Sequence, residues 1–204
     1  MLDHDEAVRL YGRWRHRTPA DAVELFKGYP GFWWIAGGWA IEAFTGKPRP
    51  HGDLDPSILR SEVALLRRHL TSRFDVWAAD KGTLRPLIGE ADEAISSTCG
   101  NLWLRESAAD PWEYDVLLMD ATMSMWTYKR DARIRRRTAD IVWNRDGINY
   151  LRPEIQLLHK APGLRAQDQE DFRACLPLLN DSDRRWLRAA ILVAHPNHPW
   201  LKEL

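Results

Sequence analysis

The sequence AGGWA at residues 36–40, followed by HGDLD at residues 51–55, decides how this chain is interpreted. Gly37 and Gly38 follow an apolar run, and glycines without a Cβ let the backbone approach a phosphate closely. Asp53 and Asp55 are one residue apart, so on a strand both carboxylates point to the same face. Two carboxylates on one face suit Mg²⁺, which prefers oxygen ligands. Together the two motifs predict a magnesium site that handles a nucleoside triphosphate.

A third carboxylate commonly completes such a site, because phosphoryl chemistry needs the charge of the reacting phosphates to be neutralised. Asp115 is the best candidate, since it lies near the start of the apolar run Tyr114–Met119. Glu113 and Asp120 are its competitors. Asp53 and Asp55 could instead have a purely structural role, as a turn or helix-cap pair. Asp115 could instead be an acid at the solvated end of a strand.

Three further side chains are candidates for phosphate contacts. Arg49 precedes the carboxylates and can donate two hydrogen bonds to a triphosphate, or it is a loop arginine. His51 can bond a phosphate, orient Asp53 or cap a turn. Lys160 follows the apolar positions of the helix at 153–161, where it contacts a phosphate or stabilises the helix end. We expect Arg165 to form an ion pair at the start of the next helix, with Asp168 or Asp171.

Composition limits the classes of protein that fit. The 204 residues suffice for one core, or for a catalytic domain with a helical extension. The 29 basic and 29 acidic residues leave no net charge, which argues against a nucleic-acid partner. Two cysteines fit a reduced, cytoplasmic setting. The acidic N-terminus has no apolar signal core, and no run is long enough to span a membrane. The oligomeric state is not indicated.

Hydrophobic spacing and turn residues predict a mixed α/β front half and a helical tail. The strand at 32–36 is followed by Gly37-Gly38 and a short helix at 39–44 that ends at Gly46. Ser61 is a candidate N-cap for the helix at 61–71, and Asp181 or Ser182 for the last helix. The other strands are expected at 52–59, 74–77, 101–105, 114–119, 126–130, 141–143 and 148–151, and the other helices at 5–15, 19–27, 153–161, 165–179 and 181–194. The predicted domains are a catalytic domain at 1–151 and a helical region at 152–204.

The segment GGWAIE at 37–42, with Gly46, Arg49, His51 and DLD at 53–55, resembles the nucleotidyltransferase superfamily and its aminoglycoside 2''-adenylyltransferase-like group. The tail at 150–172 is similar to bacterial members of that group. The resemblance implies an α+β fold, with a small mixed sheet flanked by helices and a helical C-terminal region. It implies Mg²⁺, ATP as co-substrate, and transfer of AMP to a hydroxyl. Asp53 and Asp55 would be metal ligands, and Asp115 the third carboxylate and general base.

The resemblance also suggests an aminoglycoside as acceptor, a polycation that needs acidic residues beside the metal site. Trp103 and Trp112 can stack on sugar faces or belong to the core. Other antibiotics and ordinary metabolites stay open as acceptors. The other functional classes are a non-catalytic nucleotide-binding or antitoxin-type protein, and a transferase with a protein or RNA acceptor. The candidate acids for a cationic acceptor are Glu90, Asp92, Glu93, Glu106, Asp110 and Glu113.

Overall fold

A computed structural model describes residues 4–204, so the first three residues of the acidic N-terminus lie outside the described part. The chain divides into two compact units that interleave along the sequence. Unit 1 consists of Met1–Ile35 and Pro50–Met119, and unit 2 of Ala36–Arg49 and Asp120–Leu204. The sequence-based division into 1–151 and 152–204 is a single cut and stays a prediction.

Unit 1 is built on a sheet whose strands follow the order β4-β3-β5-β6-β2-β1. Only β2 and β6 run parallel among these neighbours, and the other pairs are antiparallel. The strands are β1 (Trp33–Ile35), β2 (Pro56–Leu59), β3 (Asp75–Asp80), β4 (Thr83–Pro86), β5 (Asn101–Arg105) and β6 (Tyr114–Met119). The helices are α1 (His4–Tyr11), α2 (Pro19–Leu25) and α4 (Val63–Leu70), with a 3₁₀ turn at Arg60–Glu62.

The alternation of side chains along β5 explains why this sheet has one apolar face. Leu102 and Leu104 are fully buried, whereas Asn101, Trp103 and Arg105 between them are partly exposed. Side chains alternate across a strand with period two, so the second set lies on the opposite face of the sheet. The functional candidates of β5 and β6 therefore belong to the face away from the leucine core.

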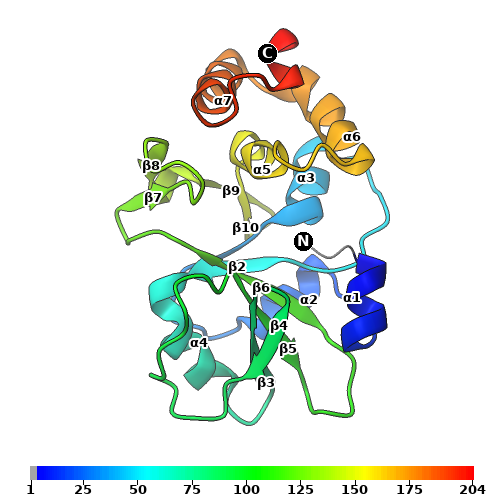
Figure 1. The fold of residues 1–204 in the computed structure, drawn as a ribbon, viewed down its shortest axis with the longest axis vertical. Helices are drawn as coiled ribbons and strands as arrows, with labels where there is room; N and C mark the ends of the chain where they lie inside the picture. Colours follow the sequence, from blue (N-terminus) through cyan, green and yellow to red (C-terminus); the bar gives the residue numbers. More distant parts are fainter. Residues whose placement is uncertain (1–3) are drawn as a thin grey trace. The chain divides into compact units, whose positions relative to one another are not determined.

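Unit 2 is mainly helical. Its helices are α3 (Gly37–Thr45), α5 (Pro153–Lys160), α6 (Ala166–Cys175) and α7 (Asp181–Ala194), with 3₁₀ turns at Thr138–Asp140, Leu176–Leu178 and Pro199–Lys202. Two antiparallel pairs accompany them, β7 (Met125–Thr127) with β8 (Arg135–Arg137), and β9 (Val142–Arg145) with β10 (Ile148–Leu151). Helix α5 packs against α3, α6 and α7, as the upper part of Figure 1 shows.

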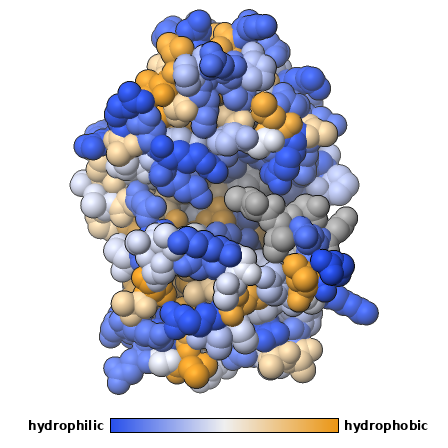
Figure 2. All heavy atoms as spheres, viewed as in Figure 1, coloured by the Kyte–Doolittle hydropathy of each residue, from blue (hydrophilic) through white to orange (hydrophobic). Residues whose placement is uncertain are grey.

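The predicted fold class, mixed α+β with a helical C-terminal region, is confirmed. Strands at 101–105 and 114–119 and the helix at 181–194 match β5, β6 and α7 residue for residue. Pro153 opens α5 as expected, because its fixed φ suits the first helical turn. Among residues 4–204, no helix combines the length and the apolar character needed to cross a bilayer. The face drawn in Figure 2 is mostly hydrophilic, with hydrophobic residues scattered over it.

Several local predictions are wrong. The strand expected at 52–59 begins only at Pro56, because its antiparallel partner β1 ends at Ile35, which pairs with Pro56. Ser61 lies inside a 3₁₀ turn and does not cap α4. The side chain of Asn180, one residue before the predicted caps, accepts a hydrogen bond from the Asp183 amide and caps α7. The strand expected at 126–130 is limited to β7, because the chain turns at residues 129–130.

Strands β4 and β8 were not expected. Strand β4 follows a two-residue turn in which Lys81 and Gly82 both have positive φ, 50° and 78°. Such a turn joins antiparallel strands tightly, but glycine at one position alone is a weak signal in a sequence. Strand β8 consists of three arginines, a composition that favours a solvated turn.

We expect Gly46→Ala to destabilise the protein by about 1–2 kcal/mol, the cost of a left-handed backbone for a residue with a Cβ. Gly46 ends α3 with φ 66°, and its amide donates to the Glu42 carbonyl at 2.8 Å. Urea unfolding measures the change. The matched control is Gly100→Ala, where a Cβ also meets open space but φ is not in the left-handed region. An equal loss at both positions would contradict the assignment of the cost to φ.

Candidate active site

The carboxylates of Asp53, Asp55 and Asp115 form one group on unit 1. One oxygen from each residue lies within 4.8 Å of the others, and all three residues are partly exposed. Asp53 and Asp55 belong to the segment that precedes β2, and Asp115 is the second residue of β6. The structure thus brings the three predicted residues together. Their chemical roles stay predictions.

Leu54 is what brings the group together. Its side chain is fully buried, whereas the aspartates on either side are partly exposed. The amide of Asp115 donates to the Leu54 carbonyl at 3.3 Å. The parallel pairing of β2 with β6 begins just beyond, at Ser57 and Leu117. The two aspartates share a side because the residue between them is anchored in the core, and not because they lie on a regular strand.

The environment of Asp115 is unfavourable for a negative charge. Burial, followed by the charge of Asp53, raises the pKa of the Asp115 carboxyl to about 7, and a hydrogen bond from Asn101 opposes this rise. Nδ2 of Asn101 lies 2.8 Å from Oδ1 and 2.9 Å from Oδ2 of Asp115. The carboxylate is thus oriented by a neutral donor, which leaves its charge in place.

The buried acids Glu113, Glu154, Asp168 and Asp171 have a different environment. Glu113, Glu154, Asp168 and Asp171 each form an ion pair with an arginine or a lysine. Asp115 has no such partner in the part of the chain that the structure describes. Burying carboxylates without a cation is costly, and a bound divalent cation removes that cost. The donor set, three carboxylates grouped within reach of one ion, fits Mg²⁺.

The two competitors of Asp115 do not join the group. Glu113 is fully buried and lies between Arg15, at 2.9 Å, and Arg17, to which it is also bonded. It ties the segment before α2 to the start of β6, a structural role. Asp120 follows β6 and is exposed. The geometry favours Asp115 as the third carboxylate.

The candidate phosphate contacts are distributed over both units. His51 belongs to unit 1, two residues before Asp53 and partly exposed. Gly37 and Gly38 open α3 in unit 2, and Gly37 has φ 64°, which favours glycine. The Gly37 amide donates to Oε1 of Gln156 at 2.7 Å. Sequence reasoning missed Gln156, because nothing in the sequence links the middle of α5 to the start of α3.

Arg49 and Lys160 belong to an ion network in unit 2. Nζ of Lys160 lies 3.0 Å from Asp168 and 2.8 Å from Asp171, and the lysine side chain is only 8% exposed. Arg49 reaches the same Asp171 at 3.4 Å. The expected pairing of Arg165 with Asp168 is confirmed at 2.8 Å. Burial alone would raise the pKa of Asp168, but Arg165 and Lys160 hold it below the usual value. A phosphate contact by Lys160 or Arg49 stays a prediction.

Most of the acids proposed for a cationic acceptor form ion pairs with arginines of the same unit. Four of the six form ion pairs, Asp92 with Arg68, Glu93 with Arg85, and both Glu106 and Glu113 with Arg15. Of the two tryptophans, Trp112 is buried in the core of unit 1, and Trp103 is partly exposed. A cationic acceptor would compete with these arginines for the four acids, and the identity of the acceptor stays a prediction.

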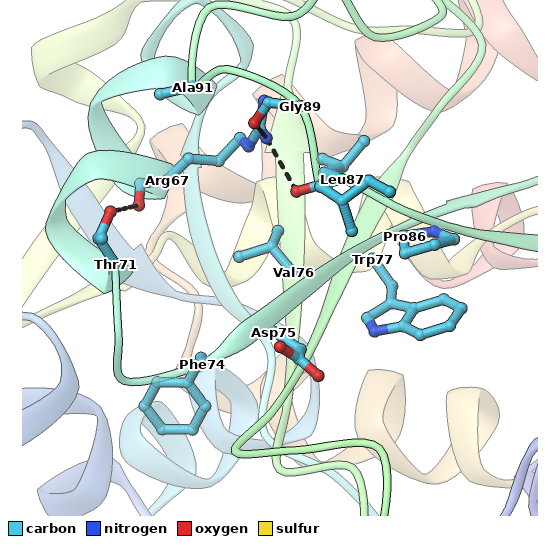
Figure 3. A pocket seen from close by; sticks show the side chains of 11 residues that line it. Arg67, Thr71, Phe74, Asp75, Val76, Trp77, Pro86, Leu87, Gly89 and Ala91 are labelled. Carbon is cyan, nitrogen blue, oxygen red and sulfur yellow. Dashed lines mark hydrogen bonds between the residues drawn. The ribbon is translucent and has the colours of Figure 1, made fainter.

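The pocket drawn in Figure 3 is separate from the carboxylate group. It has a volume of about 480 Å³ and is lined by residues of α4, β3 and the loop after β4. Arg67 closes one side by donating to the carbonyls of Leu87 and Gly89, each at 2.8 Å. None of the three aspartates lines it, so this pocket carries no argument about their chemistry.

The fold is similar to solved antibiotic-modifying proteins. One is the lincosamide antibiotic adenylyltransferase LnuA in a lincomycin-bound crystal structure, with a TM-score of 0.51 and 16% identity, covering 78% of this chain and 97% of that one. Another is the antibiotic-resistance factor ANT(2'')-Ia in solution, with a TM-score of 0.52 and 14% identity, covering 87% and 90%. No protein-family model and no curated protein sequence matches the chain. At these identities the likeness establishes the fold, which is the one that the sequence resemblance implied.

We expect Asp115→Asn to stabilise the metal-free protein, and to do so more at pH 8 than at pH 5. The pKa of Asp115 is about 7 in the folded protein and near 3.8 in the unfolded chain, so stability is lost as pH rises between these values. One pKa unit equals about 1.4 kcal/mol, and we expect a gain of roughly 1–3 kcal/mol at pH 8. Urea unfolding in the presence of EDTA measures it. A gain that is the same at both pH values would contradict this account.

Proposed function

We propose that this protein is a Mg²⁺-dependent nucleotidyltransferase that moves AMP from ATP to a hydroxyl of a small acceptor. The observation that carries the proposal is the group of Asp53, Asp55 and Asp115, in which Asp115 is paired with no lysine or arginine of the described chain. The similarity of the fold to two antibiotic-modifying proteins supports the reaction class.

In the proposed reaction, the oxygen of the acceptor hydroxyl attacks the α-phosphorus of ATP. The bond between that phosphorus and the bridging oxygen to the β-phosphate breaks, and pyrophosphate leaves. A bound Mg²⁺ supplies charge neutralisation at the phosphate oxygens. Asp53, Asp55 and Asp115 would hold the ion, and Asp115 would accept the proton of the hydroxyl.

The remaining assignments extend this proposal. Gly37, Gly38, Arg49, His51 and Lys160 would contact the nucleotide phosphates. A cytoplasmic setting is supported by Cys99 and Cys175, which are buried and unpaired. The intact carboxylate group argues against a non-catalytic or antitoxin-type role. The absence of net charge argues against an RNA acceptor. We favour a small antibiotic with a free hydroxyl as the acceptor.

We expect Asp53→Asn and Asp55→Asn each to reduce AMP transfer more than about a hundredfold, because a metal at the reacting phosphate supplies several kcal/mol. The rate is measured as the release of pyrophosphate from ATP in the presence of Mg²⁺ and the acceptor. Thermal unfolding confirms that each variant folds. The matched control is Asp92→Asn, an exposed acid paired with Arg68. Its rate should stay within twofold of the wild-type rate. Near-normal transfer by Asp53→Asn would remove the basis of the proposal.

The acceptor is identified by incubating the protein with ATP, Mg²⁺ and a panel of lincosamides, aminoglycosides and simple sugars. Mass spectrometry then detects the mass added by AMP. Because most of the acids that would serve a polycation are paired with arginines, we expect adducts on uncharged or singly charged acceptors rather than on aminoglycosides. Adducts on aminoglycosides alone would overturn this expectation and leave the reaction class standing.

In parallel, ATP should raise the melting temperature only with Mg²⁺ present.

A further inference from the structure

We propose that Asn101 is a positioning residue for the metal site, whose side-chain amide holds the Asp115 carboxylate in the orientation needed to join Asp53 and Asp55 around a divalent cation. This inference rests on the proposed function, because it assigns Asp115 to a metal ion. It concerns a residue that has no charge, belongs to a different strand from Asp115, and is not part of the carboxylate group.

The sheet places Asn101 and Asp115 on the same face. Strand β5 pairs with β6 so that Asn101 lies opposite Leu117 and Trp103 lies opposite Asp115. Asn101 and Asp115 are therefore diagonal neighbours, within reach of side chains of their length. Nδ2 of Asn101 lies at 2.8 and 2.9 Å from the two Asp115 oxygens. Contact with both oxygens fixes the rotation of the carboxylate plane, which a single contact would leave free.

The backbone of Asn101 gives this contact a rigid base. Strand β5 has a partner on each side, and Asn101 pairs with Ala79 of β3 as well as with Leu117 of β6. The residue before it, Gly100, accepts a hydrogen bond from the Leu118 amide at 2.8 Å. Only the two side-chain torsions of Asn101 are then free, and little conformational entropy is lost when the amide engages the carboxylate.

A neutral donor is what a metal ligand requires from its neighbour. An arginine or lysine in place of Asn101 would neutralise Asp115, as Arg15 and Arg17 neutralise Glu113, and would compete with the metal. An amide orients the carboxylate and leaves its full charge for the cation. Outer-shell hydrogen bonds of this kind typically change metal affinity by 10- to 100-fold.

The test measures Mn²⁺ binding directly, in the presence of a non-hydrolysable ATP analogue, from the electron paramagnetic resonance signal of free Mn²⁺. We expect Asn101→Leu, which keeps the size and removes the donor, to weaken Mn²⁺ binding at least tenfold. Asn101→Ala should behave likewise, and Asn101→Gln, which retains an amide, should lose less. The matched control is Asn149→Leu, in which an asparagine of the β9–β10 hairpin loses its contact with Asn144. Its Mn²⁺ affinity should stay within twofold of wild type.

Turnover provides the second measurement. The Mg²⁺ concentration that gives half-maximal AMP transfer should rise at least tenfold in Asn101→Leu and Asn101→Ala, whereas the rate at saturating Mg²⁺ should fall less. Thermal unfolding shows which variants fold, and one folded donor-free variant suffices. Suppose that wild type binds Mn²⁺ and transfers AMP, and that a folded donor-free variant binds Mn²⁺ as tightly as wild type. The role of Asn101 is then overturned, and the proposed function is unaffected. If wild type neither binds Mn²⁺ nor transfers AMP, the proposed function fails, and the inference fails with it.

Discussion

The hydrogen bond from the Asp115 amide to the Leu54 carbonyl is the contact on which the candidate site depends. It joins the segment that carries Asp53 and Asp55 to the strand that carries Asp115, just before the parallel pairing of β2 with β6 begins. The buried Leu54 side chain fixes the segment from the other side. The carboxylates of Asp115 and Asp53 are held close to each other by an apolar anchor and a backbone bond, neither of which carries a charge.

Holding them together has an energetic cost that the rest of unit 1 must offset. The pKa of the Asp115 carboxyl is raised to about 7, which means that the fold destabilises its charged form relative to its protonated form. Natural proteins place such local conflicts at functional sites and compensate for them elsewhere in the fold. In unit 1 the compensation includes the buried leucines of β5 and the pairing of Glu113 with Arg15 and Arg17.

The site could be predicted from the sequence only as far as residue types and local spacing allow. The Asp-x-Asp spacing identified two members of the group and the apolar run at 114–119 identified the third, although the first two do not lie on a strand. Asn101 could not be found, because its contact with Asp115 depends on the register of β5 against β6, which is set by long-range packing. Gln156 was missed for the same reason, since 119 residues separate it from Gly37. Asn180 was missed by one residue, where three consecutive polar residues are all good caps.

The same residue type performs opposite tasks in the two units. In unit 2, Asp168 and Asp171 are nearly inaccessible and form ion pairs with Lys160, Arg165 and Arg49. The pairs with Lys160 join the end of α5 to α6. In unit 1, Asp115 is held by an amide and faces Asp53, another negative charge. An aspartate whose charge is already balanced has nothing to offer a cation, whereas an unbalanced one gains free energy when a cation arrives. Asp168 and Asp171 therefore differ from Asp115 in the charge of the nearest donor, which is a cation for the first two and a neutral amide for Asp115.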